Sequence, residues 1–324
     1  MFIIWHRKLF LTIGAAIVAA SVLVMFVFGL KLGIDFTGGS LTEIRYEVMP
    51  EKSSVEAVLT ELGYENASVR QSHGELGDSY IVTTRDLTIE EQEVLETKLT
   101  SLGEGPTVAR VTTIGPVIGE ELKDKAVWAI GGVLLITIFY VAMAFMGVGY
   151  PVSSWIYGTM TVLVLFHDIL VPMAFMSLLG YYFGYEVDVL FVTALLTILG
   201  YSVNDTIVIF DRVREKLVQF RSEKRTKINV PGGLTRDEVT YSLTRPFAEI
   251  VGMAVSETMA RSINTSLTVL LALIALYLFG SVVTETFILI LIAGVIAGAY
   301  SSIFIASPLL VWYAEWQSKK ENLA

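Results

Sequence analysis

A carboxylate stands inside an apolar run in the second half of the chain. Asp205 lies in residues 200–215, GYSVNDTIVIFDRVRE, and a charged cluster of Asp211, Arg212, Arg214 and Glu215 closes that stretch. A charged side chain near a bilayer centre costs roughly 3 kcal/mol on insertion scales, so a carboxylate kept there marks a candidate functional site. The chemistry such a group offers is the binding and release of a proton.

Helical spacing predicts a polar seam around Asp205. At 100° per residue, one stripe holds Thr193, Thr197, Tyr201, Asn204, Asp205, Val208, Asp211 and Arg212. A second apolar stretch repeats the design with Glu257, Arg261, Asn264, Thr265 and Thr268. Asp205 and Arg261 both lie toward the same half of their spans, so they are able to pair. We expect a proton site in which protonation of Asp205 releases Arg261, with Tyr201, Asn204, Asn264, Thr265 and Thr268 as the supporting seam.

Two other interpretations of these residues stay open. Asp205 and Arg261 could only hold helices together, or Arg261 could extend to the inner headgroups. A second polar pair, His167 and Asp168, either supports the seam or makes a packing hydrogen bond beside a kink at Pro172. Asp168 and Asp205 could also form the dyad of an intramembrane aspartyl protease, although no GxGD-type signal surrounds either residue.

Composition excludes several classes of protein. The 324 residues are 54% hydrophobic and 17% charged, which indicates a membrane protein, and the net charge of -9 argues against a nucleic-acid binder. There is no cysteine, the three histidines are far apart, and neither H-E-x-x-H nor a phosphate-binding loop occurs. We therefore expect no enzyme activity, no metal and no cofactor, with protons as the coupling ion.

Six apolar stretches predict six membrane-spanning helices. The first, residues 9–30, follows Arg7 and Lys8 and is longer than the core of a signal peptide, so it stays as an anchor with the N-terminus in the cytoplasm. The others are residues 126–146, 152–179, 188–210, 262–280 and 285–312. Basic residues crowd the link 211–261, which agrees with a cytoplasmic link and a cytoplasmic C-terminus.

Residues 31–125 predict one small extracytoplasmic α+β domain. Strands are expected at 41–48, 67–72, 79–84 and 107–114, with helices at 53–62 and 88–102, the latter burying Ile89, Val94, Leu95 and Leu99. The order βαββαβ is that of a ferredoxin-like domain. The expected division is residues 1–30 (N-terminus and first span), 31–125 (the α+β domain) and 126–324 (spans two to six).

Three further segments have weaker signals. Residues 229–233, NVPGG, break the link, and residues 234–260 predict one or two amphipathic helices at the inner surface or a solvated connector. The small residues of the last span, Gly294, Gly298, Ser301, Ser302 and Ser307, indicate close helix packing. The glycines of FTGGS, residues 36–40, predict a turn into the first strand.

Four stretches together resemble the SecF family of protein-export membrane proteins, relatives of the resistance-nodulation-division transporters. They are GIDFTGGSL (33–41), GYSVNDTIVIFDRVRE (200–215), RSINTSLT (261–268) and YSSIFIASPLL (300–310). The resemblance covers nearly the whole chain. It implies a six-helix bundle that is half of a pseudo-symmetric core, in a bacterial inner membrane.

The resemblance also implies partners and a function. The partners would be SecD in a heterodimer, the SecYEG channel, YajC and unfolded preprotein on the outer side, and the proton-motive force would drive completion of export. The family's intramembrane Asp and essential Arg fall on Asp205 and Arg261. The link 211–261 is about twenty residues longer than the family implies. An exporter of small molecules or lipids from the same superfamily is the alternative.

Overall fold

The computed structural model describes residues 2–74, 77–146, 150–230 and 234–321. Within them, six helical stretches are long and apolar enough to cross a membrane, which confirms the predicted number of spans. They are α2 (Arg7–Phe28), α6 (Pro116–Ala144), α7 (Ser154–Phe183), α8 (Val189–Phe220), α9 (Phe247–Phe279) and the run Glu285–Lys319. Each exceeds the roughly 20 residues that span the hydrocarbon layer.

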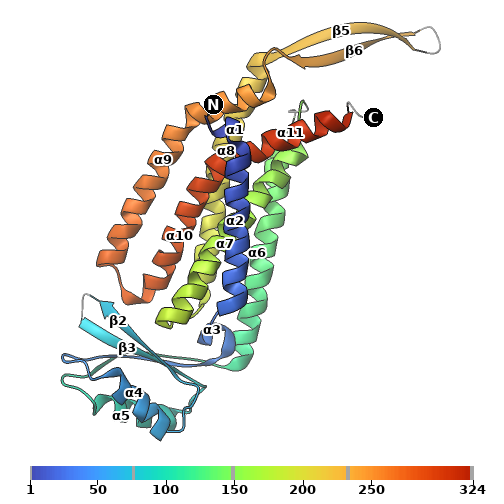
Figure 1. Ribbon diagram of the computed structural model, residues 1–324. Coiled ribbons are helices and arrows are strands. Elements are labelled where there is room, and N and C mark those ends of the chain that lie inside the picture. Colours follow the sequence, from blue (N-terminus) through green and yellow to red (C-terminus); the bar gives the residue numbers. More distant parts are fainter. Residues whose placement is uncertain (1, 75–76, 147–149, 231–233, 322–324) are drawn as a thin grey trace.

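The last span is not one uniform helix. It consists of α10 (Glu285–Ser301), a π-helical turn η2 (Ser302–Ala306) and α11 (Ser307–Glu321). The short α1 (Phe2–Trp5) precedes the first span, and Arg7 donates to both carboxylate oxygens of Glu315 on α11 at 2.8 and 2.7 Å. Both termini therefore lie at one end of the bundle, and the four-stranded sheet lies at the other end (Figure 1).

The centre of the bundle is formed by α7, α8 and α10. Leu165, Ile198 and Ile290 are almost completely buried among them. Gly294 makes the close approach possible, since a Cβ there would lie 2.2 Å from Cδ1 of Ile198. Helix α9 lies at the edge (Figure 1), where its side chains remain largely exposed from Ile263 to Phe279.

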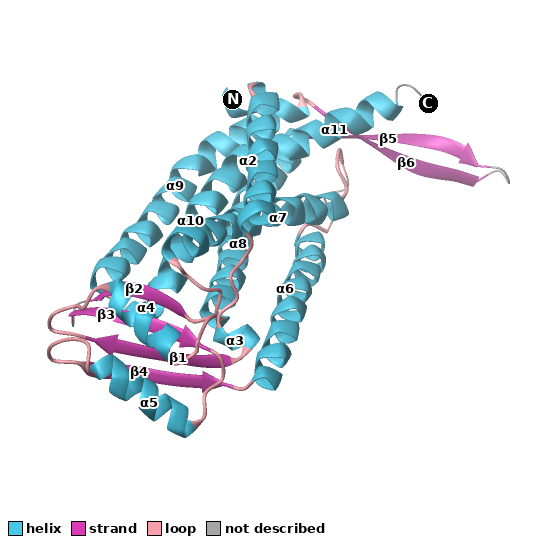
Figure 2. Cartoon of the chain, turned by 60° about the horizontal axis from the view of Figure 1, so that its bottom comes forward, coloured by secondary structure: helices cyan, strands magenta, loops and turns pink. Residues whose placement is uncertain are grey.

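The sheet domain is formed by four strands and two helices. Strands β1 (Gly39–Arg45), β2 (Ser68–Gly74), β3 (Gly77–Thr84) and β4 (Thr107–Ile114) pair antiparallel in the order β2-β3-β1-β4. Helices α4 (Lys52–Glu61) and α5 (Ile89–Thr100) cover one face, over a core that includes Ile44, Val55, Val82, Leu95 and Leu99 (Figure 2). The element order is the predicted βαββαβ.

The buried face of α5 differs from the expected one. Leu95 and Leu99 are fully buried, but Ile89 is 76% and Val94 48% exposed. In their place a half-buried polar residue faces the sheet, since Gln92 donates to Thr42 on β1 at 2.9 Å. A narrow apolar face is enough for a helix at the sheet surface.

The expectation of amphipathic helix from residue 234 is wrong for its first part. Strands β5 (Arg221–Val230) and β6 (Leu234–Leu243) form a two-stranded hairpin, and helix resumes only at Phe247. The β-branched and aromatic residues of β6 favour a strand. Across the hairpin, the guanidinium of Arg221 on β5 lies 4.6 Å from the ring centre of Tyr241 on β6. The break expected at 229–233 falls partly outside the described residues.

A tight turn joins the first span to the sheet. After α3 (Ile34–Thr37), Gly38 and Gly39 have φ of 74° and 138°, and β1 begins at Gly39, as the paired glycines predicted. A Cβ on Gly38 would lie 2.7 Å from Cα of Pro116, the first residue of α6. The entry to the sheet domain and the exit from it are thus in backbone contact.

Candidate functional site in the membrane core

Asp205 lies on α8 where it faces α9, and only one of its two carboxylate oxygens is hydrogen-bonded. Its side chain is 7% exposed, and its Oδ1 accepts a hydrogen bond from Ser262 of α9 at 2.7 Å. Its Oδ2 is buried with no hydrogen-bond partner among the described residues. A carboxylate oxygen buried without a donor is costly, and a proton on that oxygen would remove much of the cost.

The structure does not bring Arg261 to Asp205. Arg261 is exposed and, among the described residues, forms no ion pair, whereas its neighbour Ser262 holds the carboxylate. Adjacent residues on a helix are 100° apart, so only one of the two can face α8. The expected Asp205–Arg261 pair is therefore absent from this arrangement, and a serine stands in its place.

The remaining seam residues divide into buried and exposed sets. Tyr201 donates to Ser266 on α9 at 3.1 Å, which adds a second link between α8 and α9. Asn204, Asn264, Thr265 and Thr268 are exposed. Thr265 and Thr268 donate to the backbone of their own helix, at 2.8 Å each. The polar contact between α8 and α9 is thus narrower than the predicted polar stripes. The other residues predicted to lie in the seam face away from the bundle.

Asp168 forms a separate buried network. Its Oδ2 accepts hydrogen bonds from Ser202 of α8 and from Ser301 of α10, the latter at 2.9 Å. Its Oδ1 lies 2.8 Å from Nδ1 of His167. Asp168 is completely buried and joins three helices at the bundle centre. Of the two interpretations of the His167–Asp168 pair, helix packing fits this geometry.

Sequence reasoning missed the hydroxyls that hold the two carboxylates, which are Ser202 and Ser301 for Asp168 and Ser262 for Asp205. A signal was available for Ser202. Ser202 and Thr206 lie four residues apart on α8, beside the predicted polar stripe and among buried apolar residues, and Thr206 contacts Ser302 at 3.0 Å. That i, i+4 polar pair inside an apolar stripe was the available signal. Gly294 and Gly298 do pack closely on α8, as predicted.

The geometry offers no aspartyl-protease dyad. Asp168 is held by Ser202 and Ser301, and Asp205 by Ser262, so the two carboxylates have different partners on different helices. A dyad that shares one proton needs the two carboxyl groups in direct contact. Within the described part of the chain, no three His, Asp or Glu side chains are grouped so that they could hold a metal.

Ion pairs join α8 to α9 on the side of the β5–β6 hairpin. Arg212 binds Glu257 through Nε at 2.6 Å and also binds Glu215, while Lys216 binds Glu257 at 2.8 Å. This cluster ties the ends of the two helices that enclose Asp205. Of the charged cluster seen in the sequence, Arg212 and Glu215 therefore belong to a set of ion pairs next to the site.

Comparison with known proteins identifies the family. The model described as protein export membrane protein SecD/SecF, C-terminal, matches residues 94–231 and 233–316, and the SecD/SecF GG motif matches residues 23–48. The protein translocase subunit SecF of Thermobaculum terrenum is 34% identical over 98% of this chain and 94% of its own length. That of Pseudomonas aeruginosa is 34% identical over 88% of this chain and 82% of its own.

Solved structures agree with this assignment. The crystal structure of SecDF, a translocon-associated membrane protein from Thermus thermophilus, superposes with a TM-score of 0.79 at 30% identity. It covers 96% of this chain, but this chain spans only 38% of that one. A second, of SecDF in a super-membrane-facing form, gives 0.65. With six spans, the sheet domain after the first and relatives matched over nearly their full length, the chain belongs to the SecF family of protein-export membrane proteins.

Proposed function

We propose that this chain, together with SecD, uses the proton-motive force to promote the translocation and release of preproteins at the SecYEG channel. Asp205 takes up and releases the proton, and Arg261 and the seam residues Tyr201, Asn204, Asn264, Thr265 and Thr268 respond to its charge. Asp168 joins α7, α8 and α10 into the unit against which α9 moves. No cofactor takes part, and protons supply the work.

The observation that carries the proposal is the half-satisfied carboxylate of Asp205. A buried group whose second oxygen lacks a donor is stabilised by protonation in one state and by a cation or water in another. Arg261 is one residue from Ser262, so a rotation of α9 by about 100° exchanges the serine for the guanidinium. Two such arrangements of α8 and α9 are the minimum that a proton-driven cycle requires.

The exposed polar residues of α9 support a partner within the membrane. Arg261 and Asn264 face outward from a helix long enough to span, and a charge facing hydrocarbon costs roughly 3 kcal/mol. A second membrane subunit that covers this face would remove the cost. The matched SecDF chain is much longer than this one, which is consistent with SecD as that subunit. YajC and the SecYEG channel complete the assembly.

The arrangement of termini and charges supports a bacterial inner-membrane orientation with both ends in the cytoplasm. The N- and C-termini and the basic β5–β6 link lie at one end of the bundle, and the sheet domain lies at the other (Figure 1). By the positive-inside rule, the sheet domain then faces outward, where it meets the emerging unfolded preprotein.

Replacement of Asp205 tests the proposal directly. In inverted membrane vesicles that contain the full export machinery, Asp205→Asn keeps the size and the Ser262 contact but cannot ionise. We expect ATP-started translocation to continue while its stimulation by a proton gradient falls to the level measured without a gradient. Stimulation equal to that of the unchanged protein would refute the assignment.

A matched control is available on the same helix. Asp211 is 67% exposed at the α8 end and lies 3.8 Å from Arg214, a weak surface pair. Asp211→Asn removes the same charge with the same chemistry six residues away. It should leave gradient-stimulated translocation unchanged, so a loss in both variants would point to general damage to α8 rather than to a proton site.

A further inference from the structure

The uncovered face of the sheet meets the helix ends through charged contacts. Arg70 on β2 lies 3.3 Å from Glu285, the first residue of α10, and both side chains are mostly buried, at 14% and 18% exposure. Tyr185, between α7 and α8, donates to the other oxygen of Glu285 at 2.6 Å. The Arg70 guanidinium also stacks 4.4 Å from the centre of the Tyr185 ring. One arginine thus binds two separate segments of the membrane bundle.

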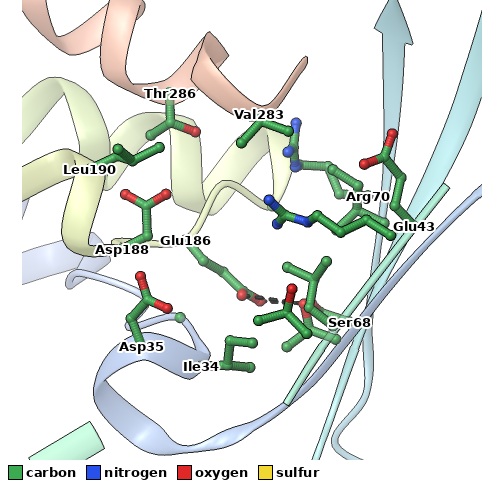
Figure 3. A pocket seen from close by; sticks show the side chains of 17 residues that line it. Ile34, Asp35, Glu43, Ser68, Arg70, Glu186, Asp188, Leu190, Val283 and Thr286 are labelled. Carbon is green, nitrogen blue, oxygen red and sulfur yellow. Dashed lines mark hydrogen bonds between the residues drawn. The ribbon is translucent and has the colours of Figure 1, made fainter. Parts of the chain in front are cut away.

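A second contact lies beside the first. Glu186, three residues before α8, accepts hydrogen bonds from Ser68 of β2 at 2.7 Å and from Thr83 of β3 at 3.3 Å. Figure 3 shows Glu186 reaching across to Ser68. Burial raises the pKa of Glu186, although the two hydroxyls and the charges of Arg70 and Lys31 oppose that rise. The stability of the contact between Glu186 and the sheet therefore depends on these hydroxyls and charges staying close to the carboxyl group.

The interface around these contacts is polar and incompletely packed. A cavity of about 260 Å³ lies between the sheet and the helix ends, next to Glu43, Arg70, Glu186 and Asp188 (Figure 3). Glu43 is 3% exposed, and its Oε1 has no hydrogen bond among the described residues but lies 3.6 Å from the guanidinium of Arg45. Nε of Arg110 has no hydrogen-bond partner among the described residues. Polar interfaces of this kind between parts of one chain permit relative movement, whereas large apolar interfaces do not.

The opposite edge of the sheet is fixed far more tightly. There the chain enters through α3 and leaves through α6, and the gap between these segments admits only glycine. A Cβ on Gly119 would lie 2.9 Å from the backbone N of Gly38, and one on Gly38 would lie 2.7 Å from Cα of Pro116. In the strand order β2-β3-β1-β4, β2 is the edge strand farthest from this exit. A hinge lies at one edge and polar contacts lie at the other.

The polar contacts end on the two helices that hold the buried carboxylates. Glu186 lies three residues before α8, which carries Ser202 and Asp205, and Glu285 begins α10, which carries Ser301. From Val189 to Asp205 the rise along α8 is about 24 Å at 1.5 Å per residue. A helix transmits a shift over that distance with little loss, so movement at Asp205 reaches the sheet through these contacts.

We propose that Arg70, Ser68 and Thr83 on the sheet, with Glu285, Tyr185 and Glu186 on the helix ends, form a releasable latch that couples the membrane helices to the sheet domain. When α8 and α10 shift, the latch opens and the sheet domain swings about the contact of Gly38 with Pro116 and Gly119. The link to proton-driven export rests on the proposed function. The opening of the latch can be measured without it.

Thiol labelling measures the opening itself. The chain has no cysteine, so a single introduced cysteine is the only thiol. Ser72 is 2% exposed on the latch face, with its hydroxyl 3.5 Å from Glu285, and Thr42 is 1% exposed on the face covered by α5. With a membrane-impermeant maleimide, Ser72→Cys should react roughly tenfold faster than Thr42→Cys, because local opening exposes only the latch face. Equal rates would show that labelling reports unfolding of the whole domain and would overturn the latch.

A covalent lock tests the consequence for export. A Cβ on Gly184 would lie 4.0 Å from Cβ of Arg70, within the range of disulfides, so Arg70→Cys with Gly184→Cys can close the latch. We expect the oxidised protein to lose its gradient-stimulated translocation and a reductant to return it to the level of the single variant Arg70→Cys, which also lacks the latch arginine but has no disulfide. A second pair, Lys31→Cys with Gly180→Cys, joins positions 3.8 Å apart outside the sheet and should have no such effect when oxidised.

The outcomes separate the latch from the proposed function. If the locked protein is still stimulated by a proton gradient and Asp205→Asn is not, the latch is wrong and the proton site stands. If Asp205→Asn retains full stimulation, the proposed function fails, and the labelling contrast between Ser72→Cys and Thr42→Cys still decides whether the latch opens.

Discussion

Asp168 and Asp205 are both buried carboxylates in the membrane core, but they differ in how completely they are bonded. Asp168 is held by His167, Ser202 and Ser301 at the junction of α7, α8 and α10. Asp205 has one donor, Ser262, on the peripheral helix α9, and its second oxygen has none among the described residues. The first arrangement fixes a single packing of three helices. The second leaves a group that a proton or a cation can still stabilise.

The difference indicates which carboxylate is structural. Hydrogen bonds between membrane helices contribute about 0.6 kcal/mol on average and about 1.7 at most, so three bonds on one carboxylate outweigh one by a factor of roughly three. A group tied that firmly is a poor candidate for a cycle in which its contacts must change. A carboxylate with one hydrogen bond, to a helix at the edge of the bundle, is a good one.

The largest expected effect is on stability at Asp168. Asp168→Ala removes three hydrogen bonds, so we expect a loss of about 2 kcal/mol in the free energy of unfolding, against about 0.6 for Asp205→Ala. Unfolding by denaturing detergent in mixed micelles, followed by circular dichroism, measures both. Equal losses, or a larger loss at Asp205, would remove the distinction between a structural and a functional carboxylate.

A smaller effect distinguishes the two sites through their serines. Ser262→Ala and Ser301→Ala each remove one hydrogen bond from a carboxylate, so both should cost about 0.6 kcal/mol, a factor of about three in the folding equilibrium. Only Ser262→Ala changes the partner of Asp205, so only it should alter gradient-stimulated translocation. If Ser301→Ala altered stimulation as much, the Asp168 network would have to be part of the moving site.

The sequence was sufficient to predict the spans and the sheet domain. The length and hydropathy of the apolar stretches reveal the spans. The βαββαβ order is revealed because the spacing of apolar residues changes between a period of two, typical of strands, and 3.6, typical of helices. The β5–β6 hairpin was not predicted, because the charged, β-branched residues 234–243 also fit an amphipathic helix. The sequence NVPGG at residues 229–233 predicted no more than a break in the link.

The site was predictable only to the level of a helix face. Asp205 and α9 were identified, but the choice between Arg261 and Ser262 depends on 100° of rotation, which apolar periodicity does not fix when exposed residues are as apolar as buried ones. Serine and threonine are common in membrane helices without a functional role. Their presence alone therefore did not identify the donors to Asp168. The latch depends on contacts between Arg70 and Glu285, 215 residues apart, which no local pattern predicts.

The smallest expected effect concerns a third carboxylate, at the other end of α8 and outside the membrane-spanning segments. Asp188 caps the helix by accepting from the Phe191 N–H at 2.7 Å. Burial raises the pKa of Asp188 to about 6, with a further rise from the charge of Asp35, although the Phe191 N–H lowers it. Like Asp205, it is a carboxylate for which hydrogen bonds offset only part of the energetic cost of burial.

The sign of the resulting pH dependence follows from the direction of the shift. A carboxyl group whose pKa is higher in the folded than in the unfolded protein favours folding when protonated, so stability should fall as pH rises from about 4 to about 6. Asp188→Asn keeps a good helix cap but cannot ionise, and its unfolding temperature in detergent should change less over this range than that of the unchanged protein. An identical pH slope in both proteins would mean that Asp188 is ionised in the fold at every pH tested, and that its hydrogen bond outweighs its burial.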